Sequence, residues 1–180
     1  FGRQTVGDGL CLSDYVLPRD DARPDYVCLF ATTVGPGVRE LAEKWKNDGD
    51  NLRSPILPAV ALEAAEGFAE LLHAKIRTMW GIGDPPGTTV KDLFKARYRG
   101  VRVSFGYPAC PRLEDQEQLF RALAVTETIG VELTDGFMMD PEGSVSSMVF
   151  HHPDARYFSL APRDKERIDE EIEGAAGQRV

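Results

Sequence analysis

The sequence predicts an α+β fold in which a mainly antiparallel, twisted sheet is bordered by helices. Two observations point to this class. Runs rich in β-branched and aromatic residues are flanked by segments with helical spacing, without the regular strand–helix–strand alternation of a parallel sheet. Glycine and proline occur in short turns between the expected elements, and the sequence has no internal repeat and no low-complexity linker. We therefore expect residues 1–180 to form a single domain, with a charged tail over residues 161–180.

The first strand is expected at Asp25–Gly35, DYVCLFATTVG, where β-branched and aromatic residues lead into a glycine. The next stretch, Gly35-Pro36-Gly37, predicts a turn into a helix. Leu41 and Trp45 then follow at helical spacing in RELAEKWKN.

The longest periodic segment predicts a helix from about Pro55 to Trp80. Its apolar side chains follow i, i+3, i+4 spacing and are expected to form one core-facing stripe: Leu57, Ala61, Ala64, Phe68, Leu72, Ile76 and Met79. At about 100° per residue, the polar side chains collect on the opposite side: Glu63, Glu66, Glu70, His73 and Arg77. This polar face is interpreted as either solvent-exposed or the wall of a cleft.

The second half of the chain predicts shorter elements. KDLFKARYRG is expected to form a helix that ends at Gly100, and the alternating run from Arg102 a strand. Leu113–Leu123 has the pattern of an amphipathic helix, with Leu119, Phe120 and Leu123 on one side. Residues 131–160 are expected to form strand, loop, strand, a tight turn at His152-Pro153-Asp154, and a last strand. RDKERIDEEIEG in the tail is interpreted as a solvated helix or a fraying end.

Composition argues against several classes of function. A formal net charge of −8 disfavours a nucleic-acid binder, which needs basic surface to contact phosphates. The longest mostly apolar stretch, Pro55–Ala65, is too short to span a membrane. Cys11, Cys28 and Cys110 favour neither a disulfide framework nor a zinc site, so a cytoplasmic location is expected. The opening FGRQTVGDG lacks a methionine and a signal-peptide pattern, and reads as a piece of something longer.

No hydrolase, kinase or dehydrogenase motif is present. Glu70 and His73 have the spacing of a carboxylate–histidine metal pair, but the second copy that such a site needs is missing, so a solvated helix face is favoured and no metal is expected. His151 and His152 are interpreted as a surface feature at a strand end rather than a catalytic base. Cys110 is interpreted as an inert buried thiol rather than a nucleophile.

The stretch RVSFGYPACPRLED contains a glycine and two prolines shortly after Arg102, a permanent cation. Arg102 has the fork geometry that binds a carboxylate through two hydrogen bonds, and Gly106 allows a ligand to approach the backbone. Pro108 and Pro111 stiffen the chain after Tyr107, so the aromatic ring is presented from a rigid loop. The competing interpretation is a strand that ends in a rigid turn with a surface arginine.

Several stretches, taken in order, resemble one known family: CLSDYVLP, PDYVCLFATTVG, AEGFAELLH, RGVRVSFGYPACP and TDGFMMDPEGSVSSMVFHHPDARYF. They are similar to the activation domain of cobalamin-dependent methionine synthase, its C-terminal S-adenosylmethionine-binding module. The resemblance covers nearly the whole chain up to about Leu160 and implies a C-shaped α+β domain.

The resemblance also implies a function. The domain would bind S-adenosylmethionine so that its methyl group passes to the cobalt of cobalamin, converting cob(II)alamin to methylcobalamin with one electron from a flavodoxin-like donor. As part of methionine synthase, a methyltransferase that makes methionine from homocysteine, it would dock on the cobalamin-binding domain. It would not be active alone, and no nucleic acid or membrane would be involved.

Family residues carry across to individual positions. Arg102 would hold the methionyl carboxylate, and Glu66 would complement the positive charge of the ligand. Ser104 takes a position that is usually alanine and acts through its backbone. The residues implied to contact S-adenosylmethionine are Glu66, Arg102, Ser104, Gly106, Tyr107 and Tyr157. Those implied to face cobalamin are Tyr107, Met139, Gly143 and Ser144, and no residue is implied to be catalytic.

The chain departs from the family pattern in three respects. Val103, Ser104 and Phe105 replace a proline-alanine-proline run, which predicts a less rigid loop, and Asp140-Pro141 replaces a tryptophan-proline pair. The family domain also has an additional N-terminal portion, with an aspartate that contacts the ligand, and no counterpart precedes Phe1, so weak binding by the isolated chain is expected. The departures at Phe105 and Asp140 motivate an alternative, a non-catalytic docking domain for a cobalamin-binding protein.

Overall fold

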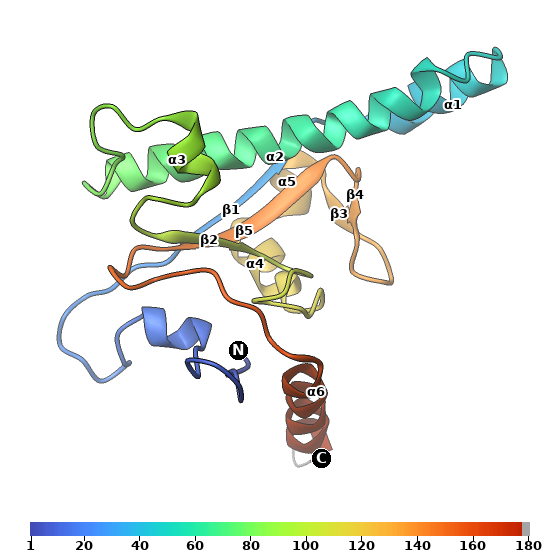
Figure 1. Cartoon of the computed structure of the whole chain (residues 1–180). Helices are drawn as coiled ribbons and strands as arrows, with labels where there is room; N and C mark the ends of the chain where they lie inside the picture. Colours follow the sequence, from blue (N-terminus) through green and yellow to red (C-terminus); the bar gives the residue numbers. More distant parts are fainter. Residues whose placement is uncertain (178–180) are drawn as a thin grey trace.

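The computed structural model describes residues 1–177 and contains a three-stranded antiparallel sheet. Its strands are β1 (Cys28–Thr33), β5 (Ser144–Phe150) and β2 (Val101–Ser104), with β5 in the centre. A second, two-stranded antiparallel ladder joins β3 (Glu132–Leu133) to β4 (Met139–Asp140). The predicted α+β class with an antiparallel sheet is confirmed (Figure 1).

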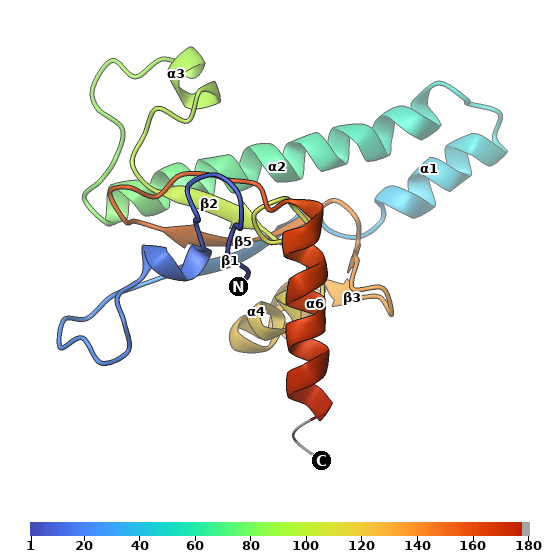
Figure 2. The ribbon, with the colours of Figure 1, turned by 60° about the horizontal axis from the view of Figure 1, so that its bottom comes forward.

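Helices cover both faces of this sheet. Helix α2 (Arg53–Met79) crosses one face, whereas α4 (Gln116–Leu123), α5 (Val125–Ile129) and the start of α6 (Pro162–Gly177) lie on the other (Figures 1 and 2). Helix α1 (Val38–Asn47) packs along the first part of α2, and this pair extends beyond the sheet. The remaining helices are short: η1 (Leu12–Tyr15), a 3₁₀ helix, and α3 (Val90–Phe94). In the described part of the chain, no helix is both long and apolar enough to cross a membrane.

The two faces of the sheet differ because side chains alternate along each strand. In β5, Met148 and Phe150 point into the larger hydrophobic cluster, while Val145 and Val149 point toward α2. All seven residues of β5 are buried. The central strand therefore supplies both cores.

The larger cluster holds most of the bulky apolar side chains. Besides β5 it takes residues from η1, β2 and the helices α4, α5 and α6: Leu12, Tyr15, Val101, Val103, Leu119, Phe120, Val125 and Ile168. The rings of Tyr15 and Phe150 meet edge to face, with centroids 6.0 Å apart. This cluster is the main hydrophobic core.

The face of α2 against the sheet differs from the predicted apolar stripe. The buried side chains are Ala61, Ala65, Ala69, His73 and Arg77, whereas Ala64, Phe68 and Met79 from the predicted stripe are exposed. Small side chains let the helix lie close to the strands, and the larger Leu72 and Ile76 pack beside this line. The predicted stripe was therefore wrong at several positions, and two residues assigned to the polar face are buried.

Three further features differ from the sequence-based expectations. Helix α3 stops at Phe94 instead of Gly100, because Ala96 takes a left-handed conformation with φ of 49°. The helix predicted from Leu113 begins at Gln116. The strand expected at the end of residues 131–160 does not form; this segment is extended, and Leu160 N–H donates to the Pro108 carbonyl. The predicted turn after His152 is present, with Ala155 N–H donating to the His152 carbonyl.

The charged tail forms a helix, and its first turns are not solvated. Asp164 is buried and accepts hydrogen bonds from the backbone N–H groups of Ala161 and Thr5. Ile168 belongs to the main core. Helix α6 thus begins against the N-terminal segment (Figure 2), and residues 178–180 of the predicted tail lie outside the described residues.

Candidate functional site

The candidate site is built around Arg102, the second residue of β2. Its neighbours Val101 and Val103 point into the main core, so alternation turns the Arg102 side chain toward α2. On α2, Glu66 and Glu70 are four residues apart and therefore lie one turn apart on the same side of the helix. Arg102 Nη2 donates to Glu66 Oε2 at 2.9 Å and to Glu70 Oε1 at 2.8 Å.

The other donors of Arg102 are also occupied. Its Nε donates to Glu70 Oε1 at 3.1 Å, and Nη1 donates to the hydroxyl oxygens of Ser104 and Ser147 at 3.2 and 3.3 Å. The two serine hydroxyls lie 2.7 Å apart across the β2–β5 pairing. The Arg102 side chain is only 14% exposed, whereas those of Glu66 and Glu70 are 40% and 53% exposed. The guanidinium is thus held from both sides by polar side chains.

Charge pairing has the largest effect on the ionisation of Arg102 and Glu70. Burial alone would lower the pKa of Arg102, but the hydrogen bond and charge of Glu70, with the charge of Glu66, raise it above its ordinary value. The pKa of Glu70 is lowered to about 2, because His73 and Arg102 stabilise its carboxylate more than burial disfavours it. His73 Nδ1 lies 3.8 Å from Glu70 Oε2, too far for a hydrogen bond, so the two hydrogen bonds from Arg102 are the direct contacts that favour the ionised carboxylate. Glu70 is therefore ionised at neutral pH.

A cavity of about 670 Å³ opens beside Arg102, in the size range of small-molecule sites. Tyr107 and Tyr157, both about half exposed, lie on its wall. The Tyr107 hydroxyl donates to Glu66 Oε1 at 3.4 Å. The residues that line the cavity are Glu66, Glu70, Lys95, Ala96, Tyr98, Gly100, Val101, Arg102, Ser104, Tyr107, Ala155, Arg156 and Tyr157. Five of the six residues predicted to contact S-adenosylmethionine are thus brought together.

The sixth residue, Gly106, is outside this lining and has a structural reason to be glycine. Its φ is +79°, and a Cβ there would lie 2.8 Å from Leu113 Cδ2. Gly106 N–H donates to the Cys110 carbonyl, and Cys110 N–H donates to the Tyr107 carbonyl, both at 2.9 Å. Phe105 is buried in the main core. The loop is therefore held by backbone hydrogen bonds and an anchored side chain despite the departures at residues 103–105.

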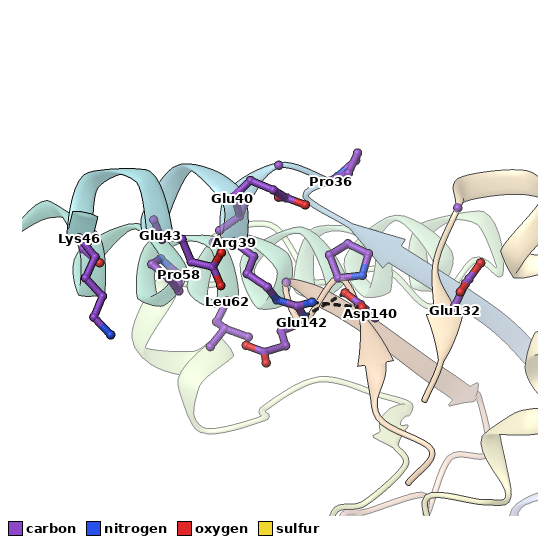
Figure 3. A pocket seen from close by; sticks show the side chains of 18 residues that line it. Pro36, Arg39, Glu40, Glu43, Lys46, Pro58, Leu62, Glu132, Asp140 and Glu142 are labelled. Carbon is purple, nitrogen blue, oxygen red and sulfur yellow. Dashed lines mark hydrogen bonds and ion pairs between the residues drawn. The ribbon is translucent and has the colours of Figure 1, made fainter. Parts of the chain in front are cut away.

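The residues predicted to face cobalamin do not all line one cavity. Tyr107, Met139 and Ser144 line a second cavity of about 490 Å³ that shares Glu66, Ser104 and Tyr107 with the first. Gly143 instead lines a third cavity of about 430 Å³ between α1, α2 and the β3–β4 ladder, where Arg39 pairs with Asp140 (Figure 3). A Cβ at Gly143 would lie 2.5 Å from Val34 Cγ2, so close packing requires glycine there.

A family model described as "Vitamin B12 dependent methionine synthase, activation domain" matches residues 2–173. This match covers nearly the whole chain, which decides the assignment. The chain belongs to the family of methionine synthase activation domains. The predicted resemblance is confirmed.

A solved structure gives an independent comparison for this activation domain. The chain is similar to the crystal structure of the MetH reactivation domain bound to AdoHcy, with 32% sequence identity and a TM-score of 0.83. The match covers 96% of this chain and 55% of that one. The chain therefore spans about half the length of the solved domain, and the two share the fold over that half.

The predicted solvated face at Glu70 and His73 was wrong for His73. The His73 ring is fully buried beneath Tyr98, with ring centroids 5.3 Å apart, and burial lowers its pKa. Among the described residues, no group of three or more His, Cys, Asp or Glu side chains is arranged to hold a metal ion. Arg77, also buried, pairs with Asp84 and lies over the Tyr98 ring. His73 and Arg77 thus form a buried polar layer against Tyr98, which lines the cavity.

Two other candidates have structural roles. His151 follows β5 directly, and its Nε2 lies 2.8 Å from Asp25 Oδ1 while its ring meets Trp80 edge to face. Burial, with a smaller effect from the Asp115 charge, raises the pKa of the Cys110 thiol to about 12. Cys110 is confirmed as a buried free thiol, and its lack of reactivity stays a prediction.

Sequence reasoning missed two partners of Arg102. Ser147 is one of them, because alternation in β5 places it on the α2 face, paired with Ser104 of β2. Glu70 was predicted to lie on a solvated helix face, although it lies one turn from Glu66 on the same helix. That i, i+4 pair was the signal that both carboxylates would meet the same cation.

Proposed function

We propose that this chain binds S-adenosylmethionine in the cavity beside Arg102 and supports the reductive methylation of cobalamin that reactivates methionine synthase. The observation that carries the proposal is the partly buried Arg102, in contact with Glu66 at the wall of a cavity that also presents Tyr107 and Tyr157. A zwitterionic amino-acid group needs one cation for its carboxylate and one anion for its ammonium, and this pair supplies both. The family membership of the chain and the AdoHcy bound to the related solved domain support the choice of ligand.

For this methyl transfer, the protein would mainly position the two cofactors and supply charged groups that bind them. Bound S-adenosylmethionine would supply the methyl group, and a cobalamin held by the partner domain of methionine synthase would accept it. Arg102 and Glu66 orient the amino-acid end of the ligand, and the tyrosines shape the wall along which the rest lies. No general base is needed for transfer from a sulfonium, because the reactive centres belong to the cofactors. A flavodoxin-like protein is the proposed electron donor, and the reducing cytoplasm the proposed location.

Calorimetric titration tests the binding half of this proposal. S-adenosylmethionine and S-adenosylhomocysteine are titrated into the chain and into Arg102→Ala, with Arg39→Ala as a control that removes an arginine from the third cavity. A charge-assisted contact to a carboxylate contributes about 1.5–3 kcal/mol, so Arg102→Ala should weaken binding about 10- to 100-fold while Arg39→Ala leaves it unchanged. Failure of the wild-type chain to bind either ligand, or equal affinity of Arg102→Ala, would contradict the proposal.

The alternative of a docking domain that has lost its ligand is supported by one observation. The Arg102 donors are all satisfied within the chain itself, so the group needs no ligand to be stable. Pull-down with a cobalamin-loaded partner domain separates the two functions. Association that does not depend on S-adenosylmethionine supports the docking domain, whereas strict dependence on it rejects that alternative.

A further inference from the structure

We propose that Glu70 is an internal competitor for the ligand, a carboxylate that occupies the binding edge of Arg102 and must move aside before the carboxylate of the ligand can bind. The inference rests on the proposed function, because it takes the ligand to carry a carboxylate that pairs with Arg102. It assigns Glu70 a role in setting affinity and selectivity at this site.

The first argument is the number of donors. A guanidinium has five N–H groups, and each one of Arg102 already has an acceptor within the chain. Glu70 Oε1 alone accepts two of them, from Nε and Nη2, which together form one edge of the fork. An incoming carboxylate that pairs with this fork through two hydrogen bonds must take over donors that are now in use.

The second argument is charge. Arg102 carries one positive charge, and Glu66 and Glu70 together carry two negative charges, so the cluster is already negative before a ligand arrives. Two further cations line the cavity, Lys95 and Arg156, but neither contacts Arg102, and Arg156 pairs with Asp8. A third carboxylate at Arg102 would meet two like charges within a few ångströms unless one of them leaves.

The third argument identifies Glu70 as the group that leaves. Ser147 is fully buried in the sheet, and Glu66 has a second contact from the Tyr107 hydroxyl. Glu70 is the most exposed of the Arg102 partners with a charge, at 53%, and its other oxygen already faces His73 Nδ1 at 3.8 Å. Among the described side chains, neither ring nitrogen of His73 has a hydrogen-bond partner. Glu70 therefore has a nearby second partner to turn to when Arg102 is taken.

The test compares two ligands that differ only in the carboxylate. S-adenosylhomocysteine and its decarboxylated analogue are titrated into wild type, Glu70→Gln and Glu70→Ala, with Glu63→Gln as a control for the same change of charge on α2. Removal of the competitor should tighten S-adenosylhomocysteine binding about 3- to 10-fold in both Glu70 variants. The decarboxylated analogue should gain nothing, and Glu63→Gln should bind both ligands like wild type.

The possible results separate this inference from the proposed function. Normal binding by wild type with unchanged or weaker S-adenosylhomocysteine binding in both Glu70 variants overturns the inference alone, and a weakening would mean that Glu70 holds the ligand. An equal gain for both ligands also overturns it, because the effect would not depend on the carboxylate. If neither wild type nor any variant binds S-adenosylhomocysteine, the proposed function fails and the inference fails with it.

Discussion

The two faces of the central sheet are built on different principles. The face that meets α4, α5 and α6 is packed with large apolar side chains such as Phe120, Met148 and Phe150. The face under α2 has alanines where the helix crosses β5. Beside them lie the buried polar side chains of His73 and Arg77 and the partly buried Arg102. Strand β2 contributes to both faces. Val101 and Val103 point into the main core, whereas Arg102 and Ser104 point toward α2.

Because of this difference, one face mainly stabilises the fold and the other carries the candidate binding site. Large apolar side chains on one face contribute most of the hydrophobic free energy. On the other face, the alanines bring the helix close enough for its carboxylates to reach an arginine on the sheet. The site thus rests on a strand whose opposite side is anchored in the main core, an arrangement that holds Arg102 on a rigid element.

The largest effect is expected from the apolar face. Phe150→Ala removes a ring that is 2% exposed and should lower the free energy of unfolding by about 3–5 kcal/mol, through lost burial and the cavity left behind. Urea unfolding followed by circular dichroism measures this. A loss below about 1 kcal/mol would show that the face is not the main source of stability.

The line of alanines on α2 should be sensitive to added volume rather than to lost volume. Ala69 is fully buried between α2 and the sheet, so Ala69→Leu should lower the free energy of unfolding by about 1–3 kcal/mol by forcing the helix away. Phe68→Leu, at an exposed neighbouring position, is the matched control and should change stability by no more than about 0.5 kcal/mol. Equal effects of the two changes would mean that α2 does not pack closely on the strands.

A smaller effect concerns pH and the polar layer. The pKa of Glu70 is lowered to about 2, so its ionised form stabilises the folded chain above its ordinary pKa near 4.5, and this stabilisation is lost as the pH falls from about 4.5 toward 2. Wild type should therefore be more stable than Glu70→Gln at pH 6, and this difference should shrink steadily in acid. Denaturant unfolding of both proteins from pH 6 to pH 3 measures it. A difference that stays constant over that range would contradict the assignment.

The smallest effect is expected away from both faces. Arg39 and Asp140 pair at 3.0 Å with both side chains about half exposed, and such pairs contribute about 0–1 kcal/mol. Arg39→Ala should therefore shift the unfolding midpoint only slightly. A loss comparable to that of Phe150→Ala would mean that the third cavity is a structural centre rather than a surface feature.

The sequence predicted the fold class, the strand at β1, the long helix and the resemblance that pointed to Arg102 and Glu66. It failed where packing across elements decides the outcome. Hydrophobic periodicity predicted that the large side chains of Phe68 and Met79 face the core. In the structure α2 lies close to the sheet, and small alanine side chains occupy the contact instead. Segment 155–160 has strand-like residues, yet it forms no ladder. The Glu70 contact was readable from its spacing to Glu66, whereas Ser147 required the β2–β5 register.

The contact between Asp164 and Thr5 has a practical consequence for anyone who trims this chain. Thr5 donates to the Asp164 carboxylate through both its backbone N–H and its hydroxyl, and Arg167 donates to the Arg3 carbonyl. These hydrogen bonds therefore hold residues 3–5 against the start of α6, although the two segments are far apart in the sequence. Deleting the first five residues should loosen the last helix as well, so a shortened version designed at one end has to be checked at the other.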